Sequence, residues 1–77
     1  MDIREVFARN LRKPRHAKGL SQEGLAHEAG IDRTYISALE RGAYSATIVM
    51  VDKLATALGV DPSRLLQRPS KARARKT

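Results

Sequence analysis

The side chains best suited to chemistry in this sequence lie in residues 31–42, IDRTYISALERG. If this stretch is a helix, a rotation of about 100° per residue gathers its apolar side chains on one side. Those side chains are Tyr35, Ile36 and Leu39. The opposite side carries short, mostly polar side chains and no acid, namely Thr34, Ser37, Ala38 and Arg41, with Arg33 on its flank. Such a helix has a polar face that needs an explanation.

That polar face has the chemistry of a reader of DNA bases. The major groove of B-DNA is about 12 Å wide and admits one helix, and short side chains let the helix lie deep in it. Arg33 could donate two hydrogen bonds to guanine O6 and N7, Thr34 could contact a thymine methyl group or a base edge, and Ser37 could reach a base edge or a phosphate. Taken alone, the face could simply be solvated, as it is on most short amphipathic helices, so the neighbouring segments decide between the two interpretations.

The segment before it, residues 21–30, predicts a partner helix. Ser21 is a good N-cap residue and Gly30 a good stop, so only about three residues separate this helix from the next one. Two short helices joined by so tight a turn form a helix-turn-helix. A helix N-terminus offers free backbone N–H groups to a phosphate, and Gln22 adds a side-chain donor. We therefore predict DNA phosphate contacts at Ser21 and Gln22.

The remaining segments also predict helices, so the fold class is all-α, a bundle of five helices over about 66 residues. Apolar residues at helical spacing predict a first helix over residues 2 to about 17. Pro14 removes one hydrogen bond and clashes with the preceding turn, so we expect a kink there or an end to regular helix near Lys13. A fourth helix is expected from near Thr47 to Gly59, and a short fifth helix follows Asp61.

Length and charge suggest one domain with a cationic tail. The chain has 77 residues and a formal net charge of +7. Five of its 15 basic residues and none of its eight acidic residues lie in residues 67–77. We therefore expect a DNA-binding domain at 1–67 and a basic, disordered tail at 68–77. Such a tail suits a polyanion such as nucleic acid, or it is only a solubilising terminus.

Other functional classes have little support in the sequence. There is no cysteine, and the two histidines, His16 and His27, stand in different helices without ligand partners at metal spacing. No serine has the local context of a nucleophile, and no glycine-rich phosphate loop is present. We expect no catalysis, metal, cofactor or small-molecule substrate. No apolar run reaches the roughly 18 residues that cross a bilayer, and MDIREVFARN lacks a signal-peptide core, so we expect a cytoplasmic protein without membrane contact.

Residues 4 to about 66 resemble the helix-turn-helix domain of the lambda-repressor and Cro type, also called the xenobiotic-response-element family. The resemblance is carried by KGLSQEGLAHEAGIDRTYISALERG, followed by LATALGV. It implies a compact bundle of five helices in which Gln22 and Arg41 bind phosphate. It also implies a structural ion pair between Arg15 and Glu40. The positions that usually face bases in that family are Arg33, Thr34, Ser37 and Ala38.

The sequence departs from the pattern of that family in four places. Relatives usually carry an apolar helix former where this chain has Pro14, and often a glutamate where it has Gly24. Ala38 stands where a longer polar residue often reads a base. The loop at 43–46 lacks the basic residues that some relatives use on phosphates, so Tyr44 and Ser45 would have to make those contacts.

The resemblance implies a sequence-specific transcriptional regulator of the repressor type, which binds double-stranded DNA through the helix at 32–41. A single helix reads too few base pairs, so we expect a homodimer on a palindromic operator. Our candidate dimer residues are Val60, Leu65 and Leu66, although Leu65 could instead complete the core. The alternative is a protein-interaction module of the same fold, either an antitoxin or a bridging coactivator.

Overall fold

The structure, a computed structural model, describes residues 2–69 and contains five helices in that part of the chain. Their bounds are Ile3–Ala17 (α1), Gln22–Ala29 (α2), Arg33–Glu40 (α3), Ile48–Leu58 (α4) and Pro62–Leu65 (α5). Residues 2–69 hold no strand, so the predicted all-α bundle is confirmed. Residues 70–77 of the expected basic tail lie outside the described residues, and the tail stays a prediction. None of the helices in residues 2–69 is long and apolar enough to span a membrane.

Each helix begins at a residue whose side chain accepts a hydrogen bond from the first turn. Ser21 Oγ accepts from the Gly24 N–H at 2.9 Å, and Asp32 Oδ1 accepts from the Thr34 N–H at 2.8 Å. Thr47 and Asp61 do the same for α4 and α5, near the positions where the sequence predicted these helices to begin, and Asp2 caps α1. These caps satisfy backbone donors that have no partner within the helix, and they therefore set where each helix starts.

Of the two alternatives expected at Pro14, a kink or an end to regular helix near Lys13, the structure excludes the second, because α1 continues through Pro14 to Ala17, as the predicted bounds of the helix require. The Lys18 N–H donates to the Pro14 carbonyl at 3.0 Å, so the helical pattern resumes after the proline. The turn that follows Pro14 is held from outside by Arg15, a buried side chain that bonds to α3 and to Leu20. The helix therefore accommodates a residue that costs roughly 3 kcal/mol in a helix interior.

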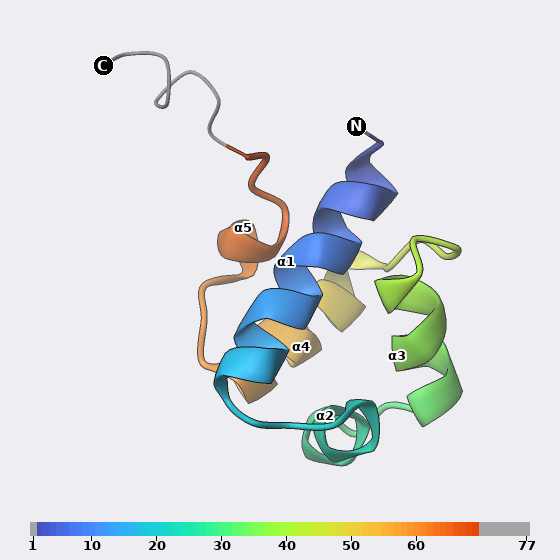
Figure 1. The fold of residues 1–77 in the computed structure, drawn as a ribbon, viewed down its shortest axis with the longest axis vertical. Helices are drawn as coiled ribbons and strands as arrows, with labels where there is room; N and C mark the ends of the chain where they lie inside the picture. The colour runs from blue at the N-terminus through green and yellow to red at the C-terminus, as the bar shows by residue number, and fades with distance from the viewer. Residues whose placement is uncertain (1, 70–77) are drawn as a thin grey trace.

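The core lies between α1 and α4 and is closed on its sides by α2, α3 and α5 (Figure 1). Its fully buried members are aliphatic, as the shortage of aromatic residues suggested. The largest of them are Val6, Leu11, Leu25, Ile36, Leu39, Leu54 and Leu65. In Figure 1, α3 flanks α1 on one side and α5 on the other. The helix-turn-helix and α5 are thus presented on different sides of α1.

Candidate nucleic-acid interface

The orientation of α3 follows from its two apolar anchors. Ile36 and Leu39 are completely buried, and Tyr35 is half-buried against the same core. Because these residues fill one side, the other side of the helix faces outward. Arg33, Thr34 and Arg41 are exposed, whereas Ser37 and Ala38 are half-buried. The face that the helical wheel selected is therefore the outer face of α3, and its base contacts stay a prediction.

The turn between α2 and α3 holds these two helices at a defined angle. Gly30 ends α2 with φ of 69°, in the left-handed region that a residue with a Cβ rarely adopts. The Ile31 N–H donates to the Ala26 carbonyl at 2.9 Å, and Asp32 then caps α3. The turn between the helices is thus Gly30 to Asp32, as expected from the sequence.

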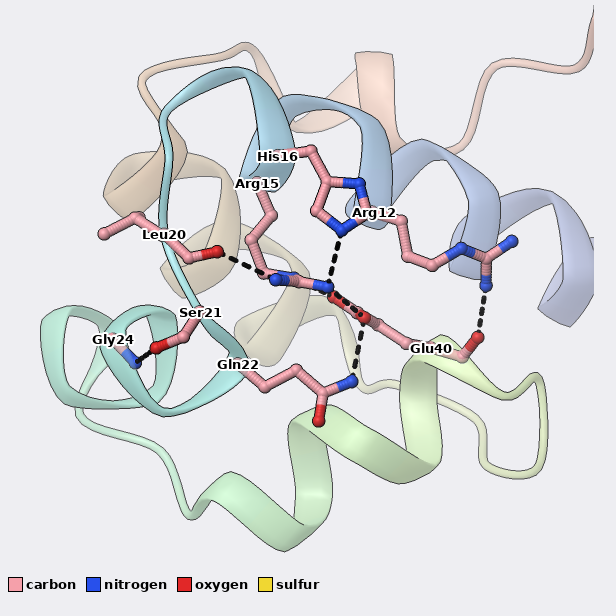
Figure 2. A network of polar contacts seen from close by, with 8 residues as sticks. All are labelled: Arg12, Arg15, His16, Leu20, Ser21, Gln22, Gly24 and Glu40. Carbon is pink, nitrogen blue, oxygen red and sulfur yellow. Dashed lines mark hydrogen bonds and ion pairs between the residues drawn. The ribbon is translucent and has the colours of Figure 1, made fainter.

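A buried ion pair joins α1 to the end of α3 (Figure 2). Arg15 Nε donates to Glu40 Oε2 at 2.6 Å, and Arg15 Nη2 donates to Glu40 Oε1 at 2.9 Å. The side chains are only 9% and 3% exposed, so the pair is shielded from water. Arg15 Nη1 also donates to the Leu20 carbonyl at 2.8 Å. The ion pair expected from the family resemblance is present, and it positions α3 rather than offering Arg15 to DNA.

The same carboxylate also binds the first residue of α2. Gln22 Nε2 donates to Glu40 Oε1 at 3.0 Å, so Glu40 links all three helices around the turn (Figure 2). An amide nitrogen carries two hydrogens, so Gln22 keeps one donor for another partner. Ser21 is exposed, and its Oγ accepts the capping bond, which leaves its hydroxyl hydrogen to donate. Both predicted phosphate contacts are therefore chemically able to bind an anion at the start of α2.

Two further arginines lie at the other end of α3. Arg12 Nη1 donates to the Glu40 carbonyl, and Arg41 Nη1 donates to Ser37 Oγ at 3.0 Å. Sequence analysis did not assign a role to Arg12. Arg12 stands three residues before Arg15, so the two side chains share one face of α1. That spacing could have indicated that Arg12, like Arg15, contacts the end of α3.

The loop after α3 is tied to it by aromatic packing. The rings of Tyr35 and Tyr44 meet edge to face, with centroids 5.1 Å apart and an angle of 85° between planes. This geometry is a favoured one for aromatic pairs. Tyr44 is still 54% exposed, and Ser45 beside it is exposed as well. Both predicted phosphate contacts thus lie on a loop that is anchored to α3 through Tyr35.

Comparison with known proteins agrees with this geometry. A family model described as helix-turn-helix matches residues 9–65. The chain belongs to the helix-turn-helix family. This result, with the solved structures described next, confirms the resemblance to the lambda-repressor and Cro type.

Three similar proteins show what this helix-turn-helix chain resembles. A hypothetical transcription factor of Neisseria meningitidis serogroup B is 47% identical over 68 residues, which cover 88% of this chain and 64% of that protein. The crystal structure of the restriction-modification controller protein C.AhdI of Aeromonas hydrophila is 47% identical, has a TM-score of 0.78, and matches 80% of this chain and 94% of that one. C.Esp1396I, solved bound to a 19 base pair DNA duplex, is 31% identical with a TM-score of 0.77, and the match covers 84% of this chain and 87% of that one.

The candidate dimer residues of this helix-turn-helix protein have different surroundings. Leu65 is 1% exposed and belongs to the core cluster, so its prediction as a dimer contact is wrong and the core role is the observed one. Val60 is half-buried, and Leu66 is 43% exposed.

The structure adds a pair of exposed apolar side chains that sequence analysis missed at the start of α4, where Ile48 is 85% and Val49 62% exposed. The signal was a run of four consecutive apolar residues, IVMV, at 48–51, because a helix that buries one face needs only some of four consecutive positions to be apolar.

Within residues 2–69 no three histidine, aspartate or glutamate side chains are grouped so that they could hold a metal ion. His16 and His27 are both exposed, and His16 Nε2 lies 3.1 Å from Arg15 Nη2 at the edge of the buried ion pair.

Proposed function

We propose that this chain is a sequence-specific transcriptional regulator of the repressor type that inserts α3 into the major groove of operator DNA. The observation that carries the proposal is the outer face of α3. It presents short polar side chains without an acid, flanked by Arg33 and Arg41, and it is held outward by a buried apolar side and a buried ion pair. The similarity to a DNA-bound controller protein and to a transcription factor supports the same function.

In this proposal the side chains divide into two groups. Those on the outer face of α3 contact base edges, namely Arg33, Thr34, Ser37 and Ala38. Those around it contact phosphates and set the register of the helix on the duplex, namely Ser21, Gln22, Arg41, Tyr44 and Ser45. Arg33, at the N-terminal end of α3, is the side chain that can donate two hydrogen bonds to one guanine.

The proposed regulator binds a palindromic operator as a homodimer, because one short helix contacts too few base pairs for specificity. The monomer surface has room for such an interface. Ile48 and Val49 are neighbouring apolar side chains and both are mostly exposed, unlike the scattered single apolar residues of ordinary surfaces. Burial of a fully exposed side chain of this size contributes about 1.5–3 kcal/mol. Leu66, which follows α5 and is 43% exposed, is the second candidate.

The test is selection of preferred sites from a pool of random duplexes, followed by titration of Arg33→Ala on the selected and on a scrambled duplex. We expect Arg33→Ala to weaken binding to the selected site by about 1–3 kcal/mol and to leave the scrambled duplex almost unchanged. The matched control is Lys13→Ala, which removes an exposed cation from α1. If wild-type protein selects no sequence, the function is that of a protein-interaction module. If Arg33→Ala weakens both duplexes alike, Arg33 contacts only phosphate.

A further inference from the structure

An open hollow lies between α1 and the C-terminal end of α3, outside the residues assigned above to bases and to the start of α2. Its volume is about 370 Å³. Three arginines line it: Arg9 and Arg12 come from α1, and Arg41 follows α3. All three are exposed, and Arg9 and Arg12 share one face of α1 because they are three residues apart.

The hollow has an excess of positive charge. It is lined by two carboxylates, but Glu40 is already bound to Arg15 and Gln22, which leaves only Glu5 against three guanidinium groups. In the described part of the chain, the ion pairs join Arg4 to Asp2 and Arg15 to Glu40, so none of the three arginines is neutralised by one. Like charges gathered in one place repel each other, and an anion in the hollow would relieve that repulsion.

Two of the three guanidinium groups are held in place by the fold. Arg12 is bound to the Glu40 carbonyl through Nη1 (Figure 2), and Arg41 is bound to Ser37 Oγ through Nη1. A guanidinium has five N–H donors, so each group keeps most of its donors for a ligand. The planar fork matches phosphate oxygens, and an anchored side chain loses less conformational freedom on binding.

The hollow also lies next to the proposed base-reading face. Arg41 stands four residues after Ser37, which is one turn of about 5.4 Å along the same side of the helix. A duplex that accepts α3 therefore brings one of its backbone strands toward this end of the helix. We propose that Arg9 and Arg12, together with Arg41, form a clamp for a backbone phosphate of the bound duplex. This inference rests on the proposed function.

The clamp predicts a change in salt dependence without a change in sequence preference. Each lost phosphate contact lowers the slope of log affinity against log salt by about 0.9. Between 50 and 200 mM salt the wild-type affinity should thus fall about 3.5-fold more than that of a variant lacking one contact. Arg9→Gln is the cleanest variant, because no hydrogen bond within the described residues is assigned to Arg9. Arg12→Gln should give a similar change, and the double variant should lose no more than about 0.9 in slope, because the clamp holds one phosphate.

The experiment compares salt titrations of wild type, Arg9→Gln, Arg12→Gln and the control Lys13→Gln on a selected and on a scrambled duplex. Lys13 lies next to Arg12 in the chain but lines the groove on the α5 side of α1. The clamp is supported if the α1 arginine variants lose slope on both duplexes and Lys13→Gln does not. It is overturned if Arg9→Gln keeps the wild-type slope while wild type still selects its site, an outcome that leaves the proposed function intact. Wild type that binds no duplex overturns both.

A second readout distinguishes a duplex phosphate from a free anion. Arginine side-chain NMR signals are followed during titration with inorganic phosphate and with the selected duplex. The clamp predicts shifts of the Arg9 and Arg12 signals with the duplex, and much weaker shifts with millimolar phosphate. Equal saturation by inorganic phosphate, with no loss of salt slope in the variants, would make the hollow a free-anion site and refute the clamp.

Discussion

Removal of the Glu40 carboxylate should destabilise the domain far more than removal of any surface charge. In Glu40→Ala, Arg15 keeps its bond to the Leu20 carbonyl but loses both bonds to Glu40, at 2.6 and 2.9 Å. A guanidinium whose side chain is 9% exposed then stays buried without a counter-charge. Loss of one partner from a buried ion pair costs about 3–5 kcal/mol.

That magnitude is comparable to the whole stability of the domain. A single core in a chain of this length rarely supplies more than about 3–5 kcal/mol. Glu40→Ala should therefore be largely unfolded at room temperature, or unfold at very low urea. Replacement of both charged residues, as Arg15→Met with Glu40→Met, removes the buried charges together. The double variant should be at least about 2 kcal/mol more stable than Glu40→Ala, because no uncompensated charge remains.

The assay is urea unfolding followed by far-UV circular dichroism at low temperature, where the single variant keeps a measurable folded baseline. Asp52→Ala serves as the control, since Asp52 is an exposed carboxylate on α4 and its loss should change stability by less than about 0.5 kcal/mol. A loss below about 1 kcal/mol for Glu40→Ala would refute the reasoning. The reasoning would also be refuted if the loss of stability in the double variant equalled the sum of the losses in Arg15→Met and in Glu40→Met.

Three further predictions address other parts of the fold. Val49→Glu should shift the sedimentation coefficient from dimer to monomer, whereas Leu66→Glu should not; the reverse result would move the interface to α5. Gly30→Ala should lower the free energy of unfolding by about 1–2 kcal/mol, because an alanine at φ of 69° is strained, and an unchanged urea midpoint would contradict this. The hydrogen bond from the Arg4 side chain lowers the pKa of Asp2 from 3.8 to about 2. The ionised Asp2 carboxylate therefore stabilises the folded state above about pH 4, and this effect is lost as the pH falls toward 2. The difference in melting temperature between wild type and Asp2→Asn should accordingly disappear over that interval, and a difference independent of pH would show that the Asp2 charge plays no part.

Features that depend on short-range physics were readable from the sequence alone. Ser21 and Asp61 each accept a hydrogen bond from a backbone N–H two or three residues away, so their residue types predicted where α2 and α5 begin. The outer face of α3 was predictable for the same reason, because the angle between neighbouring side chains on a helix is constant. The apolar positions Ile36 and Leu39 indicated which side must be buried, and the polar side followed.

Only the tertiary structure decided the features that depend on residues far apart in the chain. Pro14 sits inside a continuous helix, and the turn after it is tied through Arg15 to Glu40, 25 residues away from Arg15. Leu65 and Leu66 are indistinguishable by type, yet the packing of α5 buries the first and leaves the second 43% exposed. The angle at which the one-turn helix α5 meets the bundle decides which of these two neighbours faces the core. Long-range contacts set that angle, and local preference does not.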